Sequence, residues 1–166
     1  MTKTLNARVV LATLLALLTV FMLFATGCSM SAEEINEKNC KKAISEYCKS
    51  SSDSLKLSDV TDFDWDAVYF FGPYTGASEI EQAIGIKNDL EPTYNESMHR
   101  AVFVKGDKIV CDLIYDGYAI SDFKFDNVPF KKRISVENAV FKIVKDKNFT
   151  RLKYQGIDSN GPETTE

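Results

Sequence analysis

The sequence predicts an α+β domain, an antiparallel β-sheet meander with one long N-terminal helix and one short helix packed on one face as a two-layer sandwich. Three observations support this prediction. Apolar residues recur at helical spacing in 32–49, they alternate with acidic residues in 62–71, and two polar turns lie between apolar runs in the second half of the chain. The 166 residues suffice for one domain with its own core. We expect this domain to span 32–154, followed by a flexible tail over 155–166.

The first 28 residues have the order of a secretory signal. Lys3 and Arg8 are their only charged residues, and both precede the apolar run VVLATLLALLTVFMLF at 9–24. A helix over this run would be about 24 Å long, shorter than the ~30 Å hydrocarbon core of a bilayer. The run therefore favours a cleaved signal peptide, with an uncleaved transmembrane anchor as the alternative.

The tetrapeptide that follows, Ala25-Thr26-Gly27-Cys28, resembles the lipobox of bacterial lipoproteins. It matches at Gly27 and Cys28 and differs at Ala25, where that motif more often has Leu. The resemblance implies removal of residues 1–27, attachment of acyl chains such as palmitate to Cys28, and a short tether over 28–31. The mature protein would then be held in the lipid bilayer on the extracytoplasmic face of the cell membrane.

The first half of the domain is expected to form a helix, a strand and a second helix. A helix over 32–49 is followed by a strand over 62–71, which begins with alternating faces and is apolar on both faces from Val68 onward. The alternation assigns Phe63, Trp65, Ala67, Tyr69 and Phe71 to one face and Asp62, Asp64 and Asp66 to the other. A short helix should then begin at a cap, Thr75 or Ser78, turn Ile80, Ala83 and Ile84 inward, and end at Gly85.

The second half is expected to consist of strands. Gly106-Asp107 reads as a two-residue turn, which would place Val104 opposite Ile109 and Val102 opposite Cys111. One face of this hairpin would carry Val102, Val104, Ile109, Cys111 and Leu113. A third strand over 119–125 would continue the meander, and 136–144 with 149–154 would form another hairpin.

Three cysteines remain after Cys28, namely Cys40, Cys48 and Cys111. Cys40 and Cys48 are eight residues apart on the expected helix, so their Cα atoms would lie about 12 Å apart, too far for a disulfide. Cys111 could bridge to either of them. The alternative is three reduced thiols that pack as small apolar residues in the core.

The segment FDWDAVYFFGPYT at 63–75, with the strand beginning at Val102, resembles a strand-turn-helix pattern of small uncharacterised lipoproteins of Gram-positive bacteria. The resemblance covers roughly residues 60–115 and implies a Gram-positive surface location. It brings no catalytic residues. Within this motif, Trp65, Tyr69 and Tyr74 could line an aromatic groove for a sugar or a peptide. The alternative reading is that these rings fill a core and that Thr75 caps a helix.

Composition and motifs exclude several function classes. The chain has net charge −4, and loss of Lys3 and Arg8 with the signal peptide makes it more acidic, which disfavours nucleic-acid partners. No cofactor or metal motif is present, and an EF-hand alignment from Asp62 fails because Ala67 and Pro73 occupy the positions of the required Gly and Glu. A Cys111–His99 nucleophilic pair is disfavoured, because Cys111 lies on an apolar strand face.

These observations favour a membrane-anchored extracytoplasmic lipoprotein that acts as a non-enzymatic binding or interaction module. The alternative is a cell-envelope hydrolase that uses paired carboxylates such as Asp64, Asp66 and Asp112. That chemistry requires two carboxylates to converge in a cleft. The partner, whether an envelope protein or a small ligand, is left open.

Overall fold

The computed structural model describes residues 30–118 and 122–156. The chain divides into two units, Met1–Ser31 and Ala32–Glu166, and only Met30 and Ser31 of the first unit are described. The expected signal peptide, Cys28 and residues 157–166 of the expected tail lie outside the described residues.

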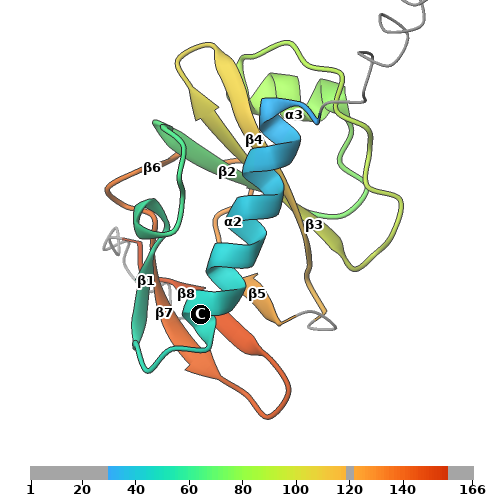
Figure 1. The fold of residues 1–166 in the computed structure, drawn as a ribbon. Helices are drawn as coiled ribbons and strands as arrows, with labels where there is room; N and C mark the ends of the chain where they lie inside the picture. Colours follow the sequence, from blue (N-terminus) through green and yellow to red (C-terminus); the bar gives the residue numbers. More distant parts are fainter. Residues whose placement is uncertain (1–29, 119–121, 157–166) are drawn as a thin grey trace, which may run out of the picture. The chain divides into compact units, whose positions relative to one another are not determined.

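The described residues of the second unit form an α+β fold with two helices and two mostly antiparallel sheets (Figure 1). The helices are α2 (Ala32–Cys48) and α3 (Ala77–Ile84), and a 3₁₀ turn at Leu57–Asp59 follows β1. The strands, in order along the chain, are β1 (Ser54–Lys56), β2 (Ala67–Phe71), β3 (Met98–Lys105), β4 (Lys108–Asp116), β5 (Phe123–Asp126), β6 (Ile134–Ser135), β7 (Val140–Lys145) and β8 (Thr150–Tyr154).

The single expected meander is in fact two four-stranded sheets. One has the order β4-β3-β2-β6, is antiparallel throughout, and is called the hairpin sheet below. The other has the order β1-β7-β8-β5 and is called the mixed sheet, because β5 pairs with β8 in parallel. The expected third strand therefore leaves the hairpin sheet, since β5 adds to the other sheet instead of pairing with β4.

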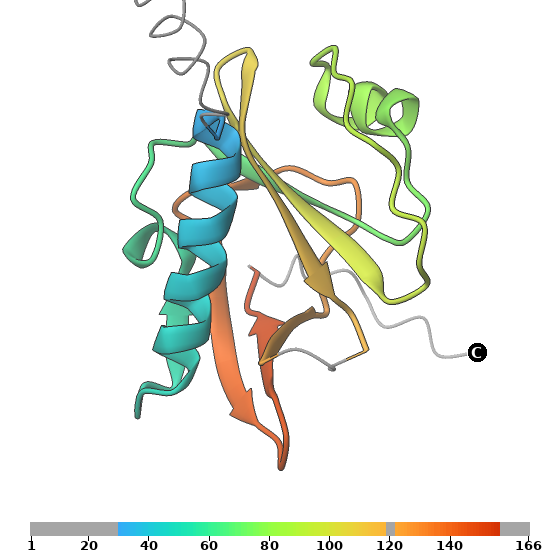
Figure 2. The ribbon, with the colours of Figure 1, turned by 45° about the vertical axis from the view of Figure 1, so that its right-hand side comes forward.

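The two helices cover opposite faces of the hairpin sheet, which corrects the expectation that both pack on one face (Figure 2). Cys40 and Ile44 of α2 share a buried cluster with Val68 and Phe70 of β2. Ile80 of α3 lies in a second cluster that contains the alternate β2 residues Ala67, Tyr69 and Phe71. All five residues of β2 are buried as a result.

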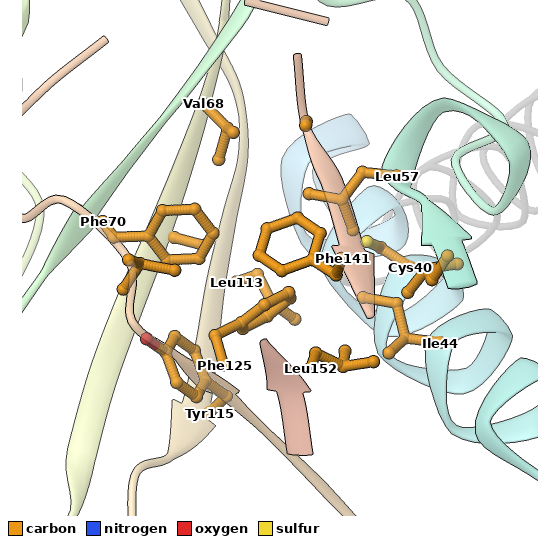
Figure 3. Packing of buried hydrophobic residues seen from close by; sticks show 14 of the residues in the cluster. Cys40, Ile44, Leu57, Val68, Phe70, Leu113, Tyr115, Phe125, Phe141 and Leu152 are labelled. Atoms are coloured by element: carbon orange, nitrogen blue, oxygen red, sulfur yellow. The ribbon is translucent and has the colours of Figure 1, made fainter. Parts of the chain in front are cut away.

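The larger cluster fills the space between the two sheets and α2. Figure 3 shows Val68, Phe70, Leu113 and Tyr115 of the hairpin sheet directed toward Phe125, Phe141 and Leu152 of the mixed sheet. Ring contacts run through this cluster, with centroid separations of 4.9 Å for Phe70–Phe125 and 5.0 Å for Tyr115–Phe125. Such aromatic packing stabilises the fold beyond the burial of area.

The β3–β4 hairpin forms at the expected turn, and Gly106 there has the positive φ of 58° that such a turn requires. Val104 pairs with Ile109 as predicted. A β-bulge follows, so that Cys111 pairs with Phe103 and not with Val102. The expected face is therefore divided, because Val102, Val104 and Ile109 face α3 whereas Cys111 and Leu113 face α2.

The short helix has its expected end and a different start. Gly85 ends α3 in the left-handed conformation with φ 73°, and its N–H donates to the Glu81 carbonyl. The N-cap is Gly76, whereas the Thr75 hydroxyl donates to the Gly72 carbonyl at 2.9 Å and so stabilises the preceding turn. The expected cap at Thr75 or Ser78 is therefore wrong.

Candidate functional site

The three residues expected to line an aromatic groove do not come together. Trp65 is 5% exposed in the cluster on the α2 face, where its indole N–H donates to Thr61 Oγ1 at 2.9 Å. Tyr69 is buried on the opposite face, under α3. Tyr74 is 58% exposed in the turn before α3. Strand β2 begins only at Ala67. The alternation predicted to start at Phe63 therefore does not apply to Trp65, which precedes the strand.

A different set of aromatic and apolar side chains is exposed where β3 begins and β4 ends. This set, called the aromatic end below, consists of Tyr94, Met98, His99, Tyr118 and Phe130. Tyr94 is 73% exposed, Tyr118 65%, Phe130 47% and Met98 38%. Large apolar side chains at such exposures are common singly, and here four of them lie on segments that meet at one end of the hairpin sheet, so this end is the candidate interaction surface.

Backbone hydrogen bonds hold this end together. The N–H of Met98 donates to the Asn95 carbonyl at 3.0 Å, which places the turn carrying Tyr94 beside the start of β3. The N–H of Gly117 donates to the Ser97 carbonyl at 2.6 Å, and the N–H of Tyr118 donates to Asp116 Oδ1 at 2.7 Å. The segments that carry Tyr94, Met98 and Tyr118 are therefore fixed against one another.

His99 connects the exposed rings to the core. Its ring lies 6.0 Å from the Phe130 ring on one side and 5.7 Å from the Tyr115 ring on the other, with tilts of 30° and 31°. Tyr115 is buried, and burial raises its pKa, so its hydroxyl stays neutral. The Tyr94 hydroxyl donates to Glu91 Oε2 at 3.1 Å, and this bond also raises the pKa of Tyr94. Both tyrosine hydroxyls therefore stay neutral, and the rings present apolar faces with polar edges.

Of the three carboxylates considered for hydrolysis, Asp66 and Asp112 have other partners in the described structure. Asp64 is exposed. Asp66 accepts hydrogen bonds of 2.8 Å from Lys105 Nζ and from the N–H of Gly106, which hold its pKa below the usual range. The same bonds fix the turn between β3 and β4, called the hairpin tip below. Asp112 lies 2.8 Å from Arg100 Nε on the α3 face of the sheet.

The described part of the chain has clefts at the hairpin tip and beside the end of α2. The first, of about 260 Å³, lies at the hairpin tip and has charges of both signs on its walls. Its lining is Glu33, Ile86, Lys87, Asn88, Asp89, Leu90, Asp107, Lys108 and Ile109. The Asn88 amide is already engaged, because it donates to the carbonyls of Ala77 and Ile86. The second cleft, of about 230 Å³, adjoins the end of α2 at Cys48 and Lys49 and the β7–β8 turn.

Residues 30–118 and 122–156 contain no group of three or more His, Cys, Asp or Glu side chains placed to hold a metal ion. Over the same residues, no helix has both the length and the apolar character needed to cross a membrane.

The residues of the aromatic end were not identified as a site from the sequence. Tyr94 and Phe130 lie in segments with turn chemistry, beside Pro92 and Pro129, where no periodicity assigns a face. The available signal was the presence of large aromatic residues inside polar turn segments, which a core does not require. Cys28, the expected lipidation site, lies outside the described residues.

No protein-family model, curated protein or solved structure matches this chain. The resemblances drawn from the lipobox and from residues 63–75 therefore stay predictions.

Proposed function

We propose that this chain is a lipoprotein of a Gram-positive cell membrane, anchored through acylated Cys28, and that its domain over 32–154 is a non-enzymatic binding module. In this proposal, the aromatic end is the surface that contacts another protein of the cell envelope. The exposure of Tyr94, Met98, Tyr118 and Phe130 at one end of the hairpin sheet is the observation that carries the proposal.

The direction of α2 supports this assignment. Glu33, near the start of α2, lines the cleft at the hairpin tip together with Asp107 and Lys108. Lys41, two turns later, donates to the carbonyl of Ile114 near the other end of β4. A chain that is anchored at Cys28 enters the domain at Ala32, so it enters at the hairpin tip. The aromatic end lies at the opposite end of β4 and is available to a partner.

The chemistry of the aromatic end favours a protein partner. Tyr, Phe and Met are enriched at the centres of protein interfaces, where they bury large areas at a low cost in side-chain entropy. The turns beside β3 and β4 are pre-organised by the hydrogen bonds of Met98, Gly117 and Tyr118, which lowers the entropy lost on binding.

The anchor is tested by intact mass spectrometry of the membrane-extracted protein, wild type beside Cys28→Ser. The proposal predicts a mature chain that begins at Cys28 and carries acyl chains, and it predicts loss of both the cleavage and the acyl mass in the variant. An unprocessed chain without lipid that is still held in the membrane would refute the anchor and support a transmembrane segment.

The binding surface is tested by chemical crosslinking on intact cells. A variant with Tyr94→Ser, Tyr118→Ser and Phe130→Ser should lose about tenfold or more of its crosslinked product, because interface aromatics contribute most of the binding energy. The matched control replaces Lys87, Asp107 and Lys108 with Ser at the hairpin tip and should change the yield less than twofold. Equal loss in both variants, at unchanged melting temperature, would refute the assignment.

A further inference from the structure

Helix α2 lies along β4, the edge strand of the hairpin sheet, and its polar side chains bind groups on that edge. Asn36 Nδ2 donates to the Val110 carbonyl at 2.8 Å. Glu37 Oε1 accepts from the N–H of Ile114 at 3.3 Å, and Lys41 Nζ donates to the Ile114 carbonyl at 3.2 Å. These contacts hold the helix in register with the strand and cover an otherwise unpaired edge.

Cys40 on α2 and Cys111 on β4 lie within this helix–strand contact. Both residues have no exposed surface, and both belong to the cluster on the α2 face. Both are free thiols in this structure, and the neighbouring Cys40 thiol, together with burial, raises the pKa of Cys111. Figure 3 shows the Cys40 side chain on α2 directed into this cluster.

The β-bulge in the hairpin places Cys111 on the sheet face that packs against Cys40. Without it, the pairing set by the turn would place Cys111 opposite Val102, whose side chain faces α3. The register shift between Phe103 and Val104 turns Cys111 toward α2 instead. Cys48 faces a different environment, since Lys145 and Asp122 are the charged groups near its thiol.

We propose that Cys40 and Cys111 form an intramolecular disulfide in the secreted protein, which rests on the proposed location outside the cytoplasm. The oxidant is a disulfide, carried by a thiol oxidoreductase or a small molecule. The two cysteine S–H bonds and the oxidant S–S bond break, and the Cys40–Cys111 S–S bond forms. The two sulfurs of the oxidant gain the electron pair and the two protons and leave as thiols.

The bond must form while the chain folds. Contact with Cys40 and burial both raise the pKa of Cys111, so in the folded reduced protein this thiol is not a nucleophile. In the unfolded secreted chain the thiols are exposed and can exchange. Once the bond is formed, it joins α2 to β4 across a loop of about 70 residues, which restricts the unfolded state. The third thiol, Cys48, stays reduced and buried.

The test uses the full chain, extracted from membranes in detergent. The protein is reduced and unfolded in denaturant, refolded in a glutathione redox buffer, blocked at free thiols and digested with trypsin without reduction. Cleavage after Lys41 and Lys42 separates Cys40 from Cys48, so each linkage gives a distinct peptide pair. The expected result is a Cys40–Cys111 peptide in most molecules, a mass loss of about 2 Da, and a melting temperature about 10 °C above that of the reduced form.

Three single-cysteine variants distinguish loss of the disulfide from misfolding. Cys48→Ser should keep the linked peptide and the rise in melting temperature. Cys40→Ser and Cys111→Ser should lose both while melting near the reduced wild type. Three free thiols after refolding of the wild type, or linkage of Cys111 to Cys48 in place of Cys40, would overturn the proposal.

The same digest of protein taken directly from cells separates the two proposals. The mass of the peptide that begins at Cys28 reports the anchor, and the Cys40–Cys111 peptide reports the disulfide. A lipidated chain without the linkage overturns the disulfide alone, whereas an unlipidated chain with the linkage refutes the anchor alone.

Discussion

The two faces of the hairpin sheet are stabilised by different means. The α2 face packs against the mixed sheet through a large aromatic cluster, in which Phe103 contacts Trp65 at 5.1 Å and Phe63 at 5.6 Å between ring centroids. The α3 face has a smaller, mainly aliphatic cluster and a buried charge, because Arg100 is only 2% exposed.

The charge on the α3 face has a structural role. Arg100 lies against Asp112 on β4, as an ion pair without an aligned hydrogen bond between Nε and Oδ1, and its Nη2 donates to the Glu91 carbonyl at 2.7 Å. It thereby fixes the loop between α3 and β3 to the sheet. Apolar packing stabilises the first face, whereas the second depends on a compensated charge, so substitution and pH should affect them differently.

The largest effect is expected on the α2 face. Phe103→Ala removes a ring with no exposed surface from between two other aromatic rings, and it should lower the free energy of unfolding by about 4 kcal/mol in a denaturant titration. A loss below about 1.5 kcal/mol would mean that the cluster repacks and that this face is not the main source of stability.

Arg100→Ala should be slightly less costly, at about 3 kcal/mol, because it leaves the buried Asp112 without its cation. The double variant Arg100→Met/Asp112→Leu should recover at least half of this loss, since no charge then remains buried. The exposed pair of Lys42 and Glu46 is the control, and Lys42→Ala should change stability by less than about 0.5 kcal/mol. Additive losses in the double variant would contradict the charge-compensation argument.

The pH dependence should distinguish the faces further. Burial raises the pKa of Asp112 from 3.8 to about 6, and Arg100 opposes this shift. The folded state therefore binds the Asp112 proton more tightly than the unfolded state. Protonation of Asp112 thus stabilises the fold most below about pH 4. The free energy of unfolding should fall by about 2 kcal/mol as the pH rises from about 4 to about 6. The difference in unfolding free energy between wild type and Asp112→Asn should carry this slope. A flat difference curve between pH 4 and 6 would contradict the raised pKa.

The smallest effect is expected in the turn that leads from β2 to α3. Tyr74 has φ 63°, a left-handed conformation that disfavours any residue with a Cβ. Tyr74→Gly should therefore be about 1 kcal/mol more stable than Tyr74→Ala in thermal unfolding, the reverse of the usual order of Gly and Ala. The usual order at this position would show that the turn relaxes when the ring is removed.

Local patterns in the sequence predicted several elements correctly. Helical spacing in 32–49 predicted α2, the turn at Gly106-Asp107 predicted the β3–β4 hairpin, and Gly85 was correctly placed at the end of α3. Each of these depends on neighbouring residues alone, so propensity and turn chemistry were sufficient.

Long-range features were not predictable in the same way. One extra residue on β4, between Ile109 and Cys111, moves Cys111 and Leu113 to the other face, and period-two alternation contains no signal for it. The parallel pairing of β5 with β8 joins segments separated in sequence by two other strands. The aromatic end combines Tyr94, Tyr118 and Phe130 from three separate turns, so its convergence depends on the tertiary fold.

Site-specific photo-crosslinking on intact cells shows whether the aromatic end contacts a protein partner. A photo-reactive phenylalanine analogue is placed at Tyr118 in the aromatic end or at Asp107 in the hairpin tip, positions at opposite ends of β4. A discrete protein adduct is expected from position 118 and none from position 107. Adducts from position 107 alone, or equal adducts from both positions, would contradict this expectation.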